Sequence, residues 1–336
     1  MELGLNSNSK SEPIISTKNK NRFVLTASTQ LLHKKYKLMK ELGNGCYGNI
    51  FLAEKTKNKQ TYAIKISRKD PTYSKIASNE IKLIRHLKNQ HIIKIYDFFY
   101  HEQYTCMVIK YYKYNLYQYQ KKNVYINHID TCVIITNICK GLDYLKGKGV
   151  IHRDLKPENI MMMDSINEHL DIVIIDFGLS ITKNELKTEK RHHKYNVQTI
   201  WYRAPEIYLE LEYTEAIDMW SLGCIAYELY WHKPLFNNKT IHGLFVKQNI
   251  LLDAPPSNIL KNIDYIDIMY DDIESPEYIA DLKGTMIPLK HKQFIKEHDN
   301  NPRLLEFILK CCCWDHHKRL TPSEAISMLK LIGDFY

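Results

Sequence analysis

The stretch that decides the fold reads Ile151-His152-Arg153-Asp154-Leu155-Lys156-Pro157-Glu158-Asn159. It places a carboxylate, an ammonium group and an amide at offsets of two and five residues, on Asp154, Lys156 and Asn159. This spacing suits proton abstraction from a hydroxyl, stabilisation of a moving phosphoryl group and binding of Mg²⁺. The pattern therefore predicts that Asp154 and Lys156 are catalytic and that Asn159 is a metal ligand.

A second acidic motif follows downstream. Asp176-Phe177-Gly178 comes directly after the apolar run Ile172–Ile175, which predicts a strand. Asp176 would then lie at a strand end, where its carboxylate can reach phosphates through Mg²⁺. We expect Asp176 to be a metal ligand together with Asn159.

Upstream, a glycine cluster has the G-x-G-x-x-G spacing, in the stretch Gly43-Asn44-Gly45-Cys46-Tyr47-Gly48-Asn49-Ile50. Glycines at this spacing let the backbone approach phosphates closely. Dinucleotide-binding folds share the spacing, but they need a helix to begin at the last glycine. Residues Ile50-Phe51-Leu52-Ala53 instead predict a strand, which favours a phosphate-covering turn between two strands.

Taken in order, these motifs resemble those of eukaryotic protein kinases. Ala63-Ile64-Lys65 matches the lysine-bearing third strand of that family, and Ala204-Pro205-Glu206 matches the end of its activation segment. The lysine two places after Asp154 resembles the Ser/Thr-specific members. The resemblance covers about residues 36–332 and implies an α+β, bilobal fold. A small β-rich N-lobe with one main helix would be followed by a larger, mainly helical C-lobe.

The resemblance also implies ATP and Mg²⁺ binding and transfer of the γ-phosphoryl group to a protein Ser or Thr hydroxyl. Asp154 would accept or orient the hydroxyl proton, and Lys156 would neutralise charge on the γ-phosphoryl group. Lys65 would contact the α- and β-phosphates and pair with Glu80. The residues assigned to ATP are Leu42, Gly43, Asn44, Gly45, Cys46, Tyr47, Gly48, Asn49, Ile50, Ala63, Lys65 and Glu80.

The periodicity along the chain agrees with two lobes. Tyr36–Ile66 alternates apolar and polar residues, Ile76–Leu87 has helical spacing, and Ile92–Phe99 and Thr105–Ile109 predict further strands. Helical patterns then dominate, at Thr131–Leu145, Ala216–Tyr230, Pro302–Cys313 and Pro322–Leu331. We predict a disordered basic leader at 1–33 and a kinase domain at 34–336, divided into N-lobe 34–110, hinge 110–114 and C-lobe 115–336.

Composition and charge indicate which partners and which cellular location to expect. The chain has 336 residues and a net charge of +9, of which residues 1–40 carry +6. Such a leader is either a solubilising tail or a binding segment for an acidic or nucleic-acid partner, which would bring the enzyme to nucleic-acid-bound targets. Its polar start lacks the apolar core of a signal peptide, and the chain lacks a membrane-spanning apolar run, so we expect no membrane partner. Eight cysteines without framework spacing predict reduced thiols, and hence a cytoplasmic or nuclear location.

Two further stretches indicate the branch of the family. Thr199–Glu206 and Ala216–Cys224 resemble the group of cyclin-dependent, mitogen-activated and dual-specificity tyrosine-regulated kinases (the CMGC group). In that group Arg203 favours proline after the acceptor residue. Cys106-Met107-Val108 is most similar to the dual-specificity tyrosine-regulated members, although Lys110 replaces their usual acidic residue. The motif of a cyclin-binding helix is missing, so we expect no cyclin. The 24 Tyr against 12 Gly resemble proteins of AT-rich genomes, such as those of some protists or large DNA viruses.

Two alternatives stay open on the sequence alone. The activation loop reads Arg191-His192-His193-Lys194-Tyr195-Asn196, with lysine where cyclin-dependent kinases carry a phosphothreonine. Either Tyr195 is phosphorylated and bound by Arg153, or the basic loop is ordered without phosphate. The alternative to an active kinase is a catalytically weak, pseudokinase-like scaffold. Such proteins typically lose the lysine, the catalytic aspartate or the Mg²⁺ aspartate, whereas this chain keeps Lys65, Asp154 and Asp176.

Overall fold

The structure is a computed structural model. It describes residues 23, 26, 30–45, 47–123, 125–163, 170–190, 194–252, 255–256, 259, 294, 296–297 and 300–333. These residues form two compact units: the described residues up to 79 together with 96–109, and residues 80–95 together with those from 110 onward. Most of the predicted leader and most of residues 253–299 lie outside the described residues.

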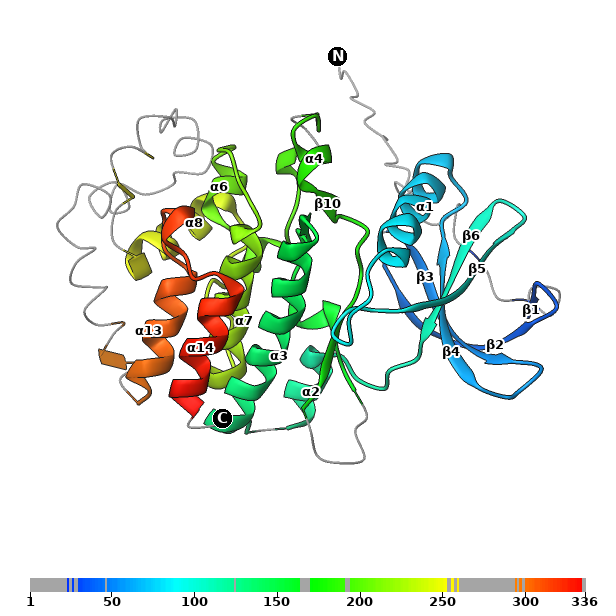
Figure 1. Cartoon of the computed structure of the whole chain (residues 1–336), viewed down its shortest axis with the longest axis horizontal. Coiled ribbons are helices and arrows are strands. Elements are labelled where there is room, and N and C mark those ends of the chain that lie inside the picture. The colour runs from blue at the N-terminus through cyan, green and yellow to red at the C-terminus, as the bar shows by residue number, and fades with distance from the viewer. Residues whose placement is uncertain are drawn as a thin grey trace, which may run out of the picture. The chain divides into compact units, whose positions relative to one another are not determined.

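The smaller unit is built on a six-stranded sheet with the order β1-β2-β3-β4-β6-β5 (Figure 1). Its strands are β1 (Leu31–Leu32), β2 (Tyr36–Asn44), β3 (Gly48–Lys55), β4 (Thr61–Ser67), β5 (Ile95–His101) and β6 (Tyr104–Lys110). The helix α1 (Pro71–Arg85) follows β4. The alternating residues of β2 and β3 bury Tyr36, Leu38 and Phe51 in one core, as a period of two requires. The predicted strands and the main helix are confirmed.

The start of this unit lies earlier than predicted. Leu31–Leu32 forms β1, and the ring of Phe23 packs edge-on against Phe51 and Tyr104, at centroid distances of 5.6 and 5.2 Å. Phe23 is 4% exposed. Parts of the predicted leader therefore belong to the smaller unit. The buried ring of Phe23 stabilises the sheet through apolar contacts.

The larger unit is mainly helical. Its long helices are α3 (His128–Gly147), α7 (Ala216–Trp231), α8 (Ile241–Leu252), α13 (Pro302–Cys311) and α14 (Pro322–Gly333). Shorter elements are α2 (Leu116–Lys122), β7 (Val150–Ile151), the 3₁₀ helix η2 (Pro157–Asn159), β8 (Ile160–Met162), β9 (Ile172–Ile174), β10 (Ile181–Thr182), α4 (Lys183–Leu186), η3 (Ile200–Tyr202), α6 (Pro205–Tyr208) and η4 (His316–Lys318). The four helical segments predicted for this part are confirmed.

Helix α7 lies at the centre of the larger unit, packed against α3 and α13 (Figure 1). Its residues from Ile217 to Leu229 are all buried, as expected for a helix that is apolar on every side. Gly223 makes the approach of α13 feasible, because a Cβ there would lie 2.6 Å from the sulfur of Cys312. The seven cysteines in the described part of the chain are free thiols, and no helix there is long and apolar enough to cross a membrane.

Candidate active site

The stretch Ile151–Asn159, here called the catalytic loop after its predicted role, is anchored on α7 by Asp218. Its two carboxylate oxygens accept hydrogen bonds from the backbone N–H groups of His152 and Arg153, at 2.8 and 3.0 Å. Asp218 is 3% exposed, and burial raises its pKa above the ordinary value. Arg153 has a φ of 65°, a conformation that costs free energy in a non-glycine residue. The hydrogen bonds to Asp218 hold the backbone in this conformation, so the loop is rigid where the chemistry is predicted.

Asp154, Lys156 and Asn159 converge as the spacing predicted. Lys156 Nζ lies 2.7 Å from Asp154 Oδ2, and the amide nitrogen of Asn159 donates to the Asp154 carbonyl oxygen at 2.8 Å. Thr199 joins them from the activation segment. Its backbone N–H and its hydroxyl both donate to Asp154 Oδ1, at 3.1 and 2.8 Å, and the hydroxyl accepts from Lys156 at 2.9 Å. The Asp154 carboxylate is thus fixed from three sides.

The two predicted metal ligands suit a hard cation. Asn159 is 5% exposed, and its nitrogen is used for Asp154, so its Oδ1 is the atom left for a ligand; no described residue donates to it. Asp176 follows the strand β9 after one residue and has a φ of 65°. Amide and carboxylate oxygens are the ligands that Mg²⁺ prefers. The donor set therefore fits Mg²⁺, with one oxygen from each residue.

The residues assigned to ATP in the smaller unit follow the predicted hairpin. Gly45 N–H donates to the Gly48 carbonyl oxygen at 2.9 Å, which closes the turn between β2 and β3. Gly48 runs so close to β4 that a Cβ would lie 2.0 Å from the carbonyl oxygen of Ile66. Ile50 pairs with Lys65 across β3 and β4, which brings the lysine next to the glycine turn. The remaining predicted positions lie on the same three strands or in the turn, at Leu42, Gly43, Asn44, Tyr47, Asn49 and Ala63, and Cys46 lies outside the described residues.

Glu80, the predicted partner of Lys65, is 3% exposed on α1. Its carboxylate accepts the backbone N–H of Phe177 at 3.2 Å, in the motif that carries Asp176. Phe177 is also buried, and its ring packs edge-on against His152 at 5.0 Å. Glu80 is therefore tied to the motif that carries Asp176, and its pair with Lys65 stays a prediction.

The match to known proteins extends over most of the chain. The protein kinase domain family matches residues 36–329. The chain belongs to the protein kinase family. A crystal structure of a kinase domain has a TM-score of 0.72 with it, covering 91% of this chain and 97% of that one. At 22% identity this likeness shows the fold alone, and it confirms the predicted bilobal class.

Several kinases of known name are similar to it in sequence. Homeodomain-interacting protein kinase 1 of Caenorhabditis elegans is 31% identical over 268 residues, which are 76% of this chain and 30% of that protein. Homeodomain-interacting protein kinase 4 of Mus musculus is 28% identical, over 87% of this chain and 54% of its own. Dual specificity tyrosine-phosphorylation-regulated kinase 2 of Drosophila melanogaster is 30% identical, over 87% of this chain and 40% of that protein. The chain spans about half the length of these relatives or less, and they confirm the resemblance to dual-specificity tyrosine-regulated kinases.

The activation segment of this kinase is held by Arg153. The guanidinium donates to both carboxylate oxygens of Glu189, at 2.5 and 3.1 Å, and to the hydroxyl of Tyr213 at 3.1 Å. Tyr213 in turn donates to the carbonyl oxygen of Lys194 at 2.9 Å and packs against the ring of Tyr195. The contacts of Glu189, Tyr213 and Thr199 with the loop were not predicted from the sequence, because each residue lies dozens of positions away from it.

Another arginine, Arg203, donates hydrogen bonds to a backbone carbonyl oxygen within the activation segment. Arg203 donates through Nε and Nη2 to the carbonyl oxygen of Gln198, at 3.2 and 2.7 Å. Gln198 has a φ of 62°, and its buried side chain bonds the Ile217 carbonyl oxygen and the Ala204 N–H. These hydrogen bonds fix the backbone next to Thr199 in one conformation. The carbonyl oxygen of Gln198 already accepts two hydrogen bonds from Arg203.

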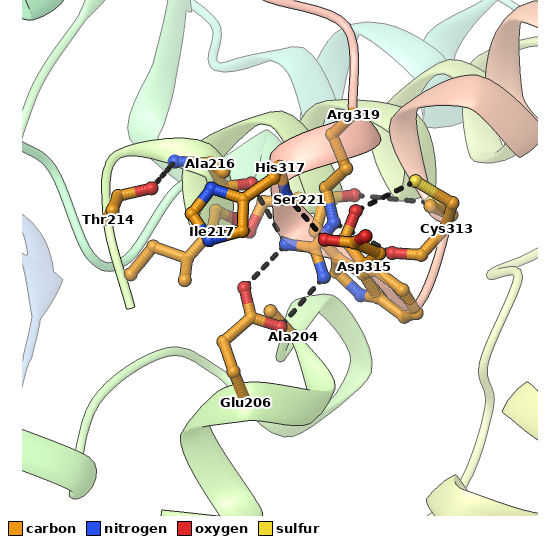
Figure 2. Close-up of polar contacts among 12 residues, drawn as sticks. Ala204, Glu206, Thr214, Ala216, Ile217, Ser221, Cys313, Asp315, His317 and Arg319 are labelled. Carbon is orange, nitrogen blue, oxygen red and sulfur yellow. Dashed lines mark hydrogen bonds and ion pairs between the residues drawn. The ribbon is translucent and has the colours of Figure 1, made fainter. Parts of the chain in front are cut away.

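The end of the activation segment is fixed by a buried ion pair between Arg319 and Glu206. Arg319 donates through both terminal nitrogens to the two carboxylate oxygens of Glu206, at 2.5 and 2.7 Å, as Figure 2 shows. Its Nε donates to the Cys313 carbonyl oxygen at 2.9 Å, and its guanidinium lies over the ring of Trp220. The whole guanidinium is thus paired although it is buried.

Proposed function

We propose that this kinase transfers the γ-phosphoryl group of ATP, with Mg²⁺, to a Ser or Thr hydroxyl of a protein. The arrangement that carries the proposal is the Asp154 carboxylate, held by Thr199 at Oδ1 and by Lys156 and Asn159 at Oδ2. A carboxylate fixed in this way is oriented to accept one proton, which is the requirement for a base that acts on a hydroxyl.

The transfer would proceed as follows. The acceptor hydroxyl gives its proton to Asp154 as its oxygen bonds to the γ-phosphorus, and the bond from that phosphorus to the bridging oxygen of ADP breaks. Lys156 stabilises the negative charge on the transferred group. When bound at Asn159 and Asp176, Mg²⁺ would neutralise charge on the phosphates. The glycine turn and Lys65 would hold the phosphates through backbone N–H groups and an ammonium group.

We further propose a preference for proline directly after the acceptor residue. The support is the Gln198 carbonyl oxygen, which already receives two hydrogen bonds from Arg203. If the residue after the acceptor lies beside Gln198, as the family resemblance implies, its N–H would find no acceptor there. Proline has no N–H to satisfy, so it loses nothing at this position.

The test is phosphate transfer from Mg·ATP to peptides with and without proline after the serine. In the Asp154→Asn variant we expect the rate to fall by roughly 10²–10⁴-fold, the usual contribution of a positioned base, with ATP affinity retained. Wild-type protein that binds ATP but transfers no phosphate to any peptide would contradict catalysis and favour the scaffold alternative. Equal rates for the two peptides would contradict the proline preference alone.

A further inference from the structure

Four exposed lysines lie close together in a stretch of the kinase that contains no acid. Residues 103–129 include neither Asp nor Glu. Within them, two lysines precede α2 and two form its last turn: Lys110, Lys113, Lys121 and Lys122, each with an exposed side chain. The stretch therefore carries a charge of +4, whereas residues 41–336 as a whole carry only +3.

One tyrosine ring brings two of these lysines together, and a second ring contacts a third lysine. The ring of Tyr114 is approached by Lys113 at 5.2 Å and by Lys122 at 4.9 Å, so lysines from before and after α2 meet over one ring. Lys121 lies 4.5 Å from the ring centre of Tyr117. Such cation–π contacts restrict the lysine stems without consuming their charge. We call the four lysines with Tyr114 and Tyr117 the Lys–Tyr surface.

No carboxylate in the described part of the chain neutralises the charge of this surface. Within the residues that the structure describes, no carboxylate forms an ion pair with any of the four lysines. Lys156 and Lys194, by contrast, each pair with an acid at 2.7 Å. The hydrogen bond from Lys122 and the positive charge of Lys113 lower the pKa of Tyr114, in agreement with a positive local field. The surface therefore has unused capacity for an anion.

The Lys–Tyr surface also lies next to the segment that follows the catalytic loop. The carbonyl oxygen of Tyr114 accepts the N–H of Met162 at 3.0 Å, and Asn115 forms an antiparallel bridge with Met161. Helix α2 packs against η2, the turn that carries Asn159, and the Leu116 side chain of α2 is fully buried. The lysines and Asp154 thus belong to one unit, joined by backbone pairing.

We propose that the Lys–Tyr surface binds aspartate and glutamate side chains of a protein substrate whose Ser or Thr lies at Asp154. The inference rests on the proposed kinase activity and adds a substrate class to it. A protein segment is favoured over nucleic acid, because the surface adjoins the catalytic loop of a kinase whose acceptor is a protein. Exposed lysines attract carboxylates at a distance and lose this attraction as salt is added.

The test compares three Ser-Pro peptides: one with aspartates before the serine, one with aspartates after it, and one with asparagines on both sides. The variant is Lys113→Gln/Lys122→Gln. Its control is Lys233→Gln/Lys330→Gln, which removes the same charge at two exposed lysines elsewhere in the same unit. We expect kcat/KM of the wild type to favour an aspartate peptide by about three- to tenfold, the range for two exposed charge contacts. The Lys113→Gln/Lys122→Gln variant should lose this preference, and the control should keep it.

The same peptides labelled with a fluorophore give a readout that needs no catalysis. Fluorescence anisotropy should show tighter binding of the aspartate peptide to wild type than to the Lys113→Gln/Lys122→Gln variant, with the difference declining as salt rises. Phosphorylation of the asparagine peptide at the same rate as the aspartate peptides, with equal binding, would overturn the inference and leave the kinase activity standing. A labelled single-stranded oligonucleotide that binds through these lysines while the aspartate peptides do not would overturn it as well.

Discussion

Both carboxylate oxygens of Glu189 accept hydrogen bonds from the guanidinium of Arg153, the residue before Asp154. The side chains are 15% and 6% exposed, so the pair is largely shielded from water. Burial opposes the charge of Arg153, but the hydrogen bonds to Glu189 and Tyr213 outweigh it and raise the pKa of the guanidinium. Glu189 thus occupies the donors that a phosphate on Tyr195 would need. This favours the hypothesis that the activation segment is ordered without phosphate.

Replacing Glu189 should therefore impair the unphosphorylated enzyme. Glu189→Gln keeps the shape of the side chain but leaves the buried guanidinium without a counter-charge, and we expect kcat/KM to fall about tenfold. Tyr195→Phe should be as active as wild type. The measurement is steady-state peptide kinetics, combined with the intact mass of the active protein to count phosphates.

The matched control is Glu212→Gln, which removes a carboxylate that pairs with Lys194 but is 86% exposed. We expect little change there, since exposed ion pairs contribute little. A phosphate found on Tyr195 in active protein, together with an inactive Tyr195→Phe variant, would contradict the prediction and restore the phosphorylation hypothesis.

Thr199 should matter for the chemical step more than for nucleotide binding. Thr199→Val keeps the size of the side chain and removes the hydroxyl that links Asp154 to Lys156. We expect kcat to fall by roughly 10- to 100-fold through misplacement of the base, with the KM for ATP unchanged. Thr199→Ser retains the hydroxyl and should retain most of kcat. Equal losses in the valine and serine variants would show that the hydroxyl does not position Asp154.

The parts of the site that were predictable are those whose chemistry needs a short, fixed spacing. Asp154, Lys156 and Asn159 lie within six residues, and the structure brings them together through hydrogen bonds of 2.7 and 2.8 Å. Glu189 has no such constraint. It lies in an ordinary charged stretch and meets Arg153 only because the activation segment folds back over the loop. Contacts of this kind depend on tertiary structure, which local patterns do not encode.

Element boundaries shifted for similar reasons. The strand predicted from Ile92 begins at Ile95, since Ile92 and Ile93 pair with the backbone of Ile174 instead. Helix α13 ends at Cys311 rather than Cys313, because Cys312 is its C-cap and leaves the helical conformation. Apolar periodicity continues through such residues, so it cannot locate the end of an element to within two positions.

The stability of the protein should depend on pH through Glu228. This carboxylate is 8% exposed and accepts the hydroxyl of Tyr202 at 2.6 Å, and burial raises its pKa. The folded state then binds more protons than the unfolded state, so this contribution to stability falls as pH rises above the ordinary value for glutamate. The variant Glu228→Gln removes this pH-dependent contribution to stability, but its amide oxygen can still accept the hydrogen bond from the Tyr202 hydroxyl.

The free energy of unfolding of Glu228→Gln, relative to wild type, should therefore increase between about pH 5 and about pH 7. Urea unfolding at several pH values measures this difference, in which other titrating groups cancel. Glu306→Gln, whose carboxylate is 58% exposed, serves as the surface control. A difference for Glu228→Gln that stays constant across the range would contradict a raised pKa.

The Arg319–Glu206 pair should be essential to the fold of the larger unit rather than to the chemistry. Both side chains are almost completely buried, at 0% and 3% exposed, and Arg319 also holds the Cys313 carbonyl oxygen. Arg319→Met leaves the Glu206 carboxylate buried without a partner, which typically costs about 3–5 kcal/mol. Chemical unfolding should detect this loss directly. Lys310→Met breaks an exposed pair with Glu306 and should cost less than about 1 kcal/mol.

Removing the charge of Glu206 as well should recover part of the loss, because the neutral amide in Glu206→Gln/Arg319→Met has a smaller desolvation cost than a carboxylate. The double variant should therefore unfold at a higher urea concentration than Arg319→Met alone. The urea midpoint of the single variant Glu206→Gln should lie between those of the double variant and the wild type. If the double variant is as unstable as the sum of the two single variants, the two side chains act independently, and the buried ion pair is not what stabilises the end of the activation segment.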